Sequence, residues 1–140
     1  MAKVNHIPYN IINENLFENF CRVNIHEKSN DLQSMVIHMP ANYSFPYIKD
    51  DINGEICFFV IEGSITIKVL DENVETTYNL NAKDMLYLKR NIFRSTSTME
   101  QRCIYLENIS GGYHPEKRIR LDESNNQSLP SDVWSHSFQI

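Results

Sequence analysis

The chain has 140 residues, enough for one domain with its own hydrophobic core, and its 41% hydrophobic and 22% charged content is ordinary for a globular protein. A net charge of -5 without a basic stripe argues against nucleic acid as a partner. No apolar run approaches the roughly 20 residues of a membrane span, and the N-terminus lacks the apolar core of a signal peptide, so we expect a cytoplasmic protein.

The N-terminal region is predicted to contain one short helix over residues 13–20. Asn13 can cap this helix, and Leu16, Phe17 and Phe20 fall on one helical face. We therefore expect residues 1–30 to form a helix and an arm ahead of the main domain.

After Asn30 the pattern changes to short strands separated by turns. The run 55–61 is densely apolar, as expected for a strand in a barrel wall, and 64–70 alternates apolar and polar residues. The turn Asp71-Glu72-Asn73 joins that strand to a returning one. The predicted strands are 32–39, 55–61, 64–70, 74–80, 85–88, 93–96 and 102–108. Such even spacing predicts an all-β barrel or sandwich over residues 31–110.

Residues 111–140 are polar and turn-rich, and we expect them to form an extended C-terminal tail. The end of the tail carries apolar side chains, at Val133, Trp134, Phe138 and Ile140. Because a free tail would not normally keep them, we expect it to dock on the barrel or on a partner subunit. Exposed sheet edges and apolar outer faces also predict a homodimer.

Two stretches, 43–63 and 81–95, resemble the two sequence motifs of the cupin superfamily. Pro46-Tyr47-Ile48-Lys49 falls where many cupins have Pro-His-x-His, and Gly63 matches the glycine that closes the first motif. In the second motif, Phe93 falls at the histidine position. The resemblance implies a single cupin-like β-barrel, or jelly roll.

Three further segments resemble the WbuC-type cupin-fold proteins, which are encoded with O-antigen and capsule genes. The segments are Arg22-Val23-Asn24-Ile25-His26, Asp31 to Gln33, and 107–115. This resemblance implies a role in cell-surface polysaccharide biosynthesis and a sugar or sugar nucleotide as the ligand.

The motif positions that hold a metal in cupins carry Tyr47, Lys49 and Phe93 here. A first-row metal needs about three or four N, O or S ligands. Lysine is cationic at neutral pH, phenylalanine has no lone pair, and tyrosine ligates mainly as phenolate, whose pKa is near 10. Glu55 alone cannot compensate. We therefore predict no metal site and no cofactor.

Tyr47 and Lys49 lie two residues apart, so both point to one side of a strand, and the alignment makes that side the barrel interior. A lysine there needs an anionic partner, such as Glu55, Glu107, or the phosphate or carboxylate of a ligand. The alternative is a solvated loop with Lys49 at its edge.

The last two strands carry further polar side chains. The same alternation predicts that Arg94 faces outward and Ser95 faces inward with Phe93. On the last strand, Tyr105 and Glu107 share the face opposite Ile104 and Leu106. The sequence leaves open which of these faces lines the cavity.

Three functions remain open. The leading one is a non-catalytic protein that binds a sugar or sugar nucleotide. The second is a metal-free sugar-nucleotide epimerase or isomerase, with Tyr47 as the acid and His38 or Glu55 as the base. The third is an interaction domain whose barrel is filled by phenylalanines, at positions 45, 58, 59 and 93. The candidate ligand-binding residues are Tyr47, Lys49, Arg22, Asn24, His26 and Tyr105.

Overall fold

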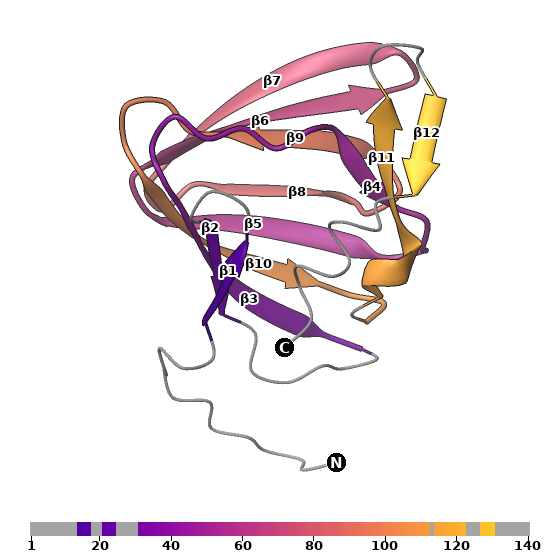
Figure 1. Ribbon diagram of the computed structural model, residues 1–140, viewed down its shortest axis with the longest axis horizontal. Coiled ribbons are helices and arrows are strands. Elements are labelled where there is room, and N and C mark those ends of the chain that lie inside the picture. The colour runs from indigo at the N-terminus through magenta and orange to yellow at the C-terminus, as the bar shows by residue number, and fades with distance from the viewer. Residues whose placement is uncertain (1–13, 18–20, 25–30, 113, 123–126, 131–140) are drawn as a thin grey trace.

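The computed structural model describes residues 14–17, 21–24, 31–112, 114–122 and 127–130 (Figure 1). Its strands pair antiparallel in two sheets that face each other, with the order β1-β2-β3-β10-β5-β8 in sheet A and β12-β11-β4-β9-β6-β7 in sheet B. Sheet A consists of β1 (Glu14–Phe17), β2 (Cys21–Asn24), β3 (Gln33–Met39), β5 (Glu55–Glu62), β8 (Met85–Lys89) and β10 (Cys103–Ile109). Sheet B consists of β4 (Ile48–Asp50), β6 (Ser64–Asp71), β7 (Val74–Asn81), β9 (Phe93–Ser97), β11 (Arg118–Asp122) and β12 (Gln127–Pro130).

The core lies between the two sheets and follows the two-residue period of the strands. On β5, for example, Ile56, Phe58 and Val60 are buried, whereas the alternate residues face away from the core. The buried core side chains are Met35, Ile37, Met39, Tyr43, Phe45, Ile56, Phe58, Val60, Ile65, Ile67, Leu80, Leu88, Cys103, Tyr105 and Ile109.

The predicted strands and turns are confirmed. Each predicted strand is present, and its ends fall within one residue of the prediction. Between β6 and β7, Glu72 and Asn73 have φ angles of 50° and 65°, as a tight two-residue hairpin turn requires.

Gly63 makes the turn between β5 and β6, with a φ of +83°. A Cβ atom at this position would lie 2.1 Å from the carbonyl oxygen of Arg102, next to the start of β10. The glycine that closes the first motif is therefore required both by its backbone conformation and by the close approach of a second chain segment.

The prediction of an N-terminal helix is wrong for the part that the structure describes. Glu14–Phe17 forms β1, which pairs antiparallel with β2. A helix of eight residues is well below the roughly 12–15 at which isolated helices become even marginally stable. A strand beside β2 instead finds a backbone partner for its N–H and C=O groups, so the sheet overrides the helical pattern.

Part of the predicted tail joins the barrel. β11 pairs with β4 and so extends sheet B, and a 3-10 turn, Pro115–Lys117, precedes it. The apolar end of the tail, including Trp134, lies outside the described residues. In the ranges that are described, no helix is long and apolar enough to cross a membrane.

Candidate functional site

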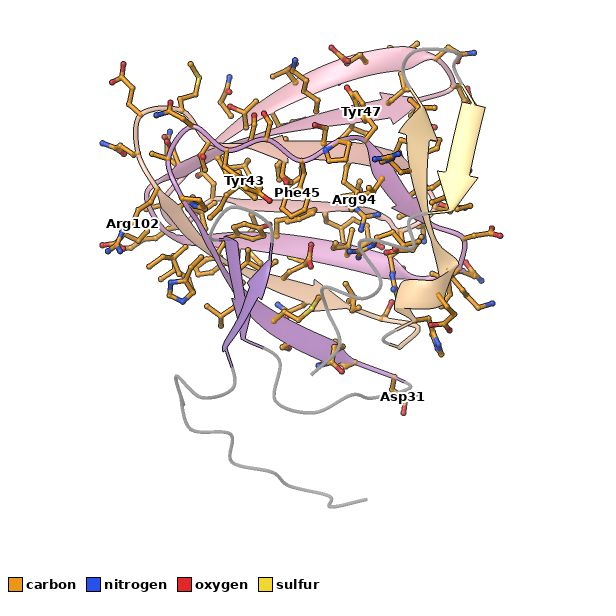
Figure 2. All side chains as sticks on the ribbon, viewed as in Figure 1. Asp31, Tyr43, Phe45, Tyr47, Arg94 and Arg102 are labelled. Carbon is orange, nitrogen blue, oxygen red and sulfur yellow. The ribbon has the colours of Figure 1, made fainter. Side chains whose placement is uncertain are left out.

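At one end of the barrel interior, three arginines converge on one carboxylate, and we call Asp50, Arg90, Arg94 and Arg118 the arginine cluster. Arg90 Nε and Arg94 Nη2 both donate to Oδ2 of Asp50 at 3.1 Å, and Arg118 Nε donates to Oδ1 at 3.1 Å. Figure 2 shows Arg94 pointing into the space between the sheets. A single carboxylate thus accepts three charge-assisted hydrogen bonds, which are the strong kind.

The cluster is assembled from segments far apart in the sequence. Asp50 ends β4 and lies opposite Arg118 of β11 in the strand register, while Arg94 comes from β9. Arg90 belongs to the β8–β9 loop, and its backbone N–H and C=O bond to Gly54 and Asp50 at 2.9 and 2.8 Å. Loop and sheet therefore hold the cluster in one geometry.

Arg90 also ties the cluster to the turn that follows β10. Its Nη1 donates to the carbonyl oxygens of Ser110 and Gly112, at 2.8 and 2.7 Å. Arg94 Nη1 in turn donates to the carbonyl oxygen of Arg90 at 3.1 Å. These carbonyls carry only partial charge, so they satisfy donors without neutralising the guanidinium groups.

The cluster holds an excess of positive charge out of water. The side chains of Asp50, Arg90 and Arg94 are only 1 to 2% exposed, and that of Arg118 is 11% exposed. Burial alone would raise the pKa of Asp50, but the three guanidinium groups outweigh burial and hold that pKa well below its usual range. The buried Arg90 and Arg94 share the one ionised carboxylate of Asp50, so positive charge exceeds negative charge among these three side chains.

Glu107 is a further buried carboxyl group that interacts electrostatically with this cluster. It lies on the inner face of β10 and is only 7% exposed. Burial raises its pKa, although Arg94 and Arg118 act in the opposite direction. Among the hydrogen bonds of the described residues none reaches the Glu107 carboxyl, so this group does not pair with the arginines as Asp50 does.

The donor set does not fit the metal that many cupins hold. Guanidinium groups cannot ligate a cation, and they repel one. The Asp50 oxygens are already taken by arginines. Within the described part of the chain, no group of three or more His, Cys, Asp or Glu side chains comes together. The chemistry of this end of the barrel suits an anion instead.

The other half of the interior is apolar and aromatic. Tyr43 and Phe45 meet edge to face at 5.2 Å between ring centroids, and Phe58 and Tyr105 lie 5.9 Å apart. In Figure 2 Tyr43 and Phe45 lie between the sheets, on the side of Arg94 toward the barrel end that carries Arg102. Phe45 and Phe58 therefore fill the core as the third hypothesis requires, whereas Phe59 and Phe93 are half-buried outside it.

The structure brings Lys49 to Phe93 rather than to a carboxylate. The Lys49 ammonium lies 4.9 Å from the centroid of the Phe93 ring, a cation–π contact. Its neighbour Asp50 is the buried residue, so alternation places Lys49 on the outer face of β4. Tyr47 is buried, and its hydroxyl donates to Glu75 on β7.

The acid and base candidates lie apart. Glu55 is on the outer face of β5, where its carboxylate bonds the Lys89 ammonium at 3.1 Å. His38 is half-buried on the outer face of β3, opposite Ile104 of β10. Neither side chain reaches the interior that Tyr105 occupies, where the tyrosine is 3% exposed.

The candidates from the N-terminal segment are only partly placed. Arg22 and Asn24 lie on β2, opposite His38 and Val36 of β3. His26 lies outside the described residues. The backbone therefore brings this segment beside β3, at the far side of sheet A from β8.

On β4 and on β9, the charged interior residue lies one position after the residue that the alignment placed inside. Asp50 is inside rather than Lys49, and Arg94 rather than Phe93, so the prediction that Arg94 faces outward is wrong. A slip of one residue exchanges the two faces of a strand. The open question on β10 is also answered, because Tyr105 and Glu107 face inward.

Sequence reasoning missed Asp50, Arg90, Arg94 and Arg118 as a group. The run Arg94 to Thr98 has no apolar residue, so the sequence does not show which of its side chains face the interior. The one signal in the sequence is that a charged residue, Arg94, stands at a position that could face inward. The pairing itself joins residues 40 to 68 positions apart, which no local pattern reveals.

No protein-family model matches the chain, and no curated protein matches it by sequence. Solved structures do resemble it. The cupin domain of Cnp3 from Schizosaccharomyces pombe superposes with a TM-score of 0.60 at 17% identity, over 75% of this chain and 74% of that one. A cupin superfamily protein from Desulfitobacterium hafniense gives 0.55 at 16%, over 66% and 78%. Drosophila melanogaster CENP-C bound to CAL1 gives 0.56 at 12%, over 64% and 73%. The two facing antiparallel sheets and these likenesses together establish that the chain has the cupin fold.

Proposed function

We propose that this chain is a cupin-fold protein of cell-surface polysaccharide biosynthesis that binds an anionic sugar, such as a sugar nucleotide, without a metal. The observation that carries the proposal is that two buried arginines, Arg90 and Arg94, share the single carboxylate of Asp50. Buried charge is costly unless it is paired, and a phosphate or carboxylate would supply the pairing. Arginine also matches the oxygens of both groups in two-pronged geometry.

The cluster has one member closest to solvent. Arg118 has 11% of its side chain exposed, against 2% for Arg90 and Arg94. An anion that entered at Arg118 would meet the remaining guanidinium groups behind it. The neutral part of the sugar would then lie toward the barrel surface, where hydroxyl groups keep water contacts.

The pathway part of the proposal rests on the resemblance to WbuC-type proteins. One of the segments that carries this resemblance, 107–115, contributes directly to the cluster region. It supplies Glu107 and the carbonyl oxygens of Ser110 and Gly112 that Arg90 binds. The residues of the resemblance and the residues of the site therefore meet at one place.

The test is a thermal-shift titration of the whole protein with sugar nucleotides, inorganic phosphate and neutral sugars. We expect the anionic compounds to raise the Tm of the wild-type protein. Arg118→Met should weaken their binding about 10- to 100-fold, because a hydrogen bond to a charged group contributes about 1.5–3 kcal/mol. Methionine keeps most of the stem volume, so the fold should survive.

The matched control is Arg120→Met, which removes an exposed arginine two residues further along β11. It should leave the ligand shift unchanged. Lys49→Met, in the same assay, tests the site proposed from the motif alignment. No shift with any sugar nucleotide, or equal losses in both arginine variants, would contradict the proposal. Conversion of a bound sugar nucleotide to an isomer, seen by chromatography, would move it to the epimerase class.

A second candidate function is an interaction domain with a filled barrel. The observation that favours it is the packed aromatic half of the interior, where Tyr43, Phe45, Phe58 and Tyr105 are all less than 10% exposed. One structural relative, CENP-C, was solved bound to the protein CAL1, so the cupin fold also serves in protein recognition. This candidate predicts no ligand shift with any of the sugars and phosphates.

A further inference from the structure

Glu107 is a buried carboxyl group for which the chain itself supplies no hydrogen-bond partner. It lies on the inner face of β10 and is only 7% exposed. The residues beside it in the sheet, Met35 of β3 and Phe58 of β5, are buried and apolar. No hydrogen bond within the described part of the chain ends on its carboxyl. Buried polar groups of folded proteins are nearly always hydrogen-bonded, so a donor from outside the chain is the expected partner.

The arginine cluster acts on Glu107 through its charge and not through hydrogen bonds. The charged groups that act on Glu107 electrostatically are Arg94, Arg118, Asp50 and Arg90. Arg94 donates instead to Asp50 and to the carbonyl oxygen of Arg90. Arg90 donates to Asp50 and to two carbonyl oxygens of the turn after β10. Glu107 therefore belongs to the charged end of the interior without being part of its hydrogen-bond network.

The Glu107 carboxyl borders space that a donor from outside the chain can reach. In the described ranges, neither of its oxygens is among the side-chain atoms that are both sealed from water and without a hydrogen-bond partner. Because no group of the chain bonds these oxygens, each of them must touch space that a molecule of the size of water can enter. That space lies on the side of the barrel wall that faces the arginine cluster.

The chemistry of this carboxyl favours a cationic donor. Burial raises the pKa of Glu107, which means that the ionised form is disfavoured as long as it has no partner. A hydroxyl group of a ligand would supply a hydrogen bond but would leave that charge unpaired. An ammonium group supplies the hydrogen bond and the opposite charge together. The arginines repel a cation unless the same ligand also brings an anion to them, so a ligand with both charges matches both groups.

We infer that Glu107 determines the specificity of the site for amino sugars, because its carboxylate binds the ammonium group of a sugar whose phosphate binds the arginine cluster. This inference rests on the proposed function, since the anion must bind at the cluster. Glu107 and the arginines act on each other electrostatically, so the amine should lie near the phosphate, on the ring carbon next to the one that carries it. UDP-glucosamine has an amine at that carbon, UDP-glucose has a hydroxyl, and UDP-N-acetylglucosamine has a neutral amide.

Calorimetric titration of the whole wild-type protein with these three UDP sugars measures the preference. We expect UDP-glucosamine to bind about 10- to 100-fold more tightly than UDP-glucose, which is the contribution of one hydrogen bond between charged groups. UDP-N-acetylglucosamine should bind no more tightly than UDP-glucose, because acetylation removes the positive charge. This comparison needs no variant, so its result does not depend on how a substitution affects folding.

Glu107→Gln tests whether this carboxylate causes the preference. Glutamine keeps the shape of the side chain but carries no charge to pair with an ammonium, so UDP-glucosamine and UDP-glucose should bind almost equally. The lost negative charge also strengthens the binding of both diphosphates to the arginines, and the ratio of the two dissociation constants cancels this effect. The matched control is Glu62→Gln, which removes a carboxylate that is 57% exposed at the end of β5. The control should keep the full preference for UDP-glucosamine.

Three results would overturn the inference. Equal binding of UDP-glucosamine and UDP-glucose by the wild type would do so and would leave the proposed function intact, because the anion would still bind. A preference that survives in Glu107→Gln, or that disappears in Glu62→Gln as well, would show that the amine is recognised elsewhere or only through the net charge of the protein. No binding of any of the three UDP sugars would overturn the inference and the proposed function together.

Discussion

Asp50 is the residue on which the charged interior depends. It is 1% exposed and accepts hydrogen bonds from Arg90, Arg94 and Arg118. Removing one partner of a buried ion pair typically costs about 3–5 kcal/mol, because the other charge remains buried. Loss of the Asp50 carboxylate would leave both Arg90 and Arg94 buried without it, so this carboxylate contributes more to the stability of the fold than either of these arginines does.

Glu107 should make stability depend on pH in the opposite sense to Asp50. Burial raises its pKa, and Asp50 adds to that, while Arg94 and Arg118 oppose it. A raised folded-state pKa means that the stability contributed by protonated Glu107 is full below the ordinary value of 4.5 and is lost as pH rises through the folded-state pKa. Glu107→Gln keeps the neutral form at every pH.

We therefore expect the free energy of unfolding of wild type, relative to Glu107→Gln, to fall as pH rises above about 4.5. Urea unfolding from pH 4.5 to 8 measures this difference. Asp50 does not affect this comparison. Because the pKa of Asp50 is lowered in the folded protein, the stability that its carboxylate contributes is lost only at pH values below 3.8, the ordinary pKa of aspartate. Parallel pH profiles for the two proteins would contradict the expected role of Glu107.

At the scale of elements, the positions of most strands were predictable from the sequence. For β4 and β9, the sequence did not predict which residues face the interior. Apolar alternation and turn residues located β5, β6 and β7 to within one residue, because the core and the tight turns both leave local patterns. The β9 sequence, Phe93-Arg94-Ser95-Thr96-Ser97, has only one apolar residue. Its phase is set instead by the bond between Arg94 and Asp50, which local reasoning cannot see.

The helix prediction for the N-terminal segment was wrong because a local pattern was present but did not decide the structure. Its local pattern fits a helix, but pairing between β1 and β2 decides the structure. The candidate site was only partly predictable. The two motifs indicated the stretches of sequence that contribute to the site. The residues that meet inside, however, are Asp50 and Arg94 rather than Lys49 and Phe93.

The β5–β6 turn is expected to be intolerant of any side chain. Gly63→Ala would meet the carbonyl oxygen of Arg102, 2.1 Å from the added Cβ, in a backbone conformation with φ of +83°. We expect a loss of at least about 2 kcal/mol, since such backbone strain alone costs about 1–3 kcal/mol. Urea unfolding measures the change.

Gly63→Asn separates the two causes. Asparagine tolerates positive φ better than alanine does, but its Cβ meets the same oxygen. If close approach dominates, both variants lose similar stability. Full recovery of stability in Gly63→Asn would show instead that the φ angle alone requires the glycine.

At the scale of the whole molecule, the barrel interior is divided into an aromatic half and a charged half. The core cluster supplies hydrophobic stabilisation in the first, and the arginine cluster connects β4, β9 and β11 in the second. Sheet B is therefore held together at that end by ion pairs as well as by backbone hydrogen bonds. Binding of an anion there would stabilise the fold and the assembled sheet together.

The same division predicts the metal content of the purified protein. Three guanidinium groups around Asp50 repel a divalent cation at the charged end, and the other end is filled by apolar side chains. We expect elemental analysis to find no stoichiometric transition metal, and excess EDTA to leave Tm unchanged. About one Zn, Fe, Mn or Ni per chain would contradict this expectation.

Because three arginines donate hydrogen bonds to the single carboxylate of Asp50, the order in which these residues can be replaced during evolution is restricted. A lineage that loses Arg118 still has a carboxylate bound by two arginines. A lineage that loses Asp50 first keeps Arg90 and Arg94 buried without the carboxylate that accepts their hydrogen bonds. Neutral drift through the cluster is therefore directional, with the arginines open to replacement one at a time and the aspartate fixed until the last of them has gone.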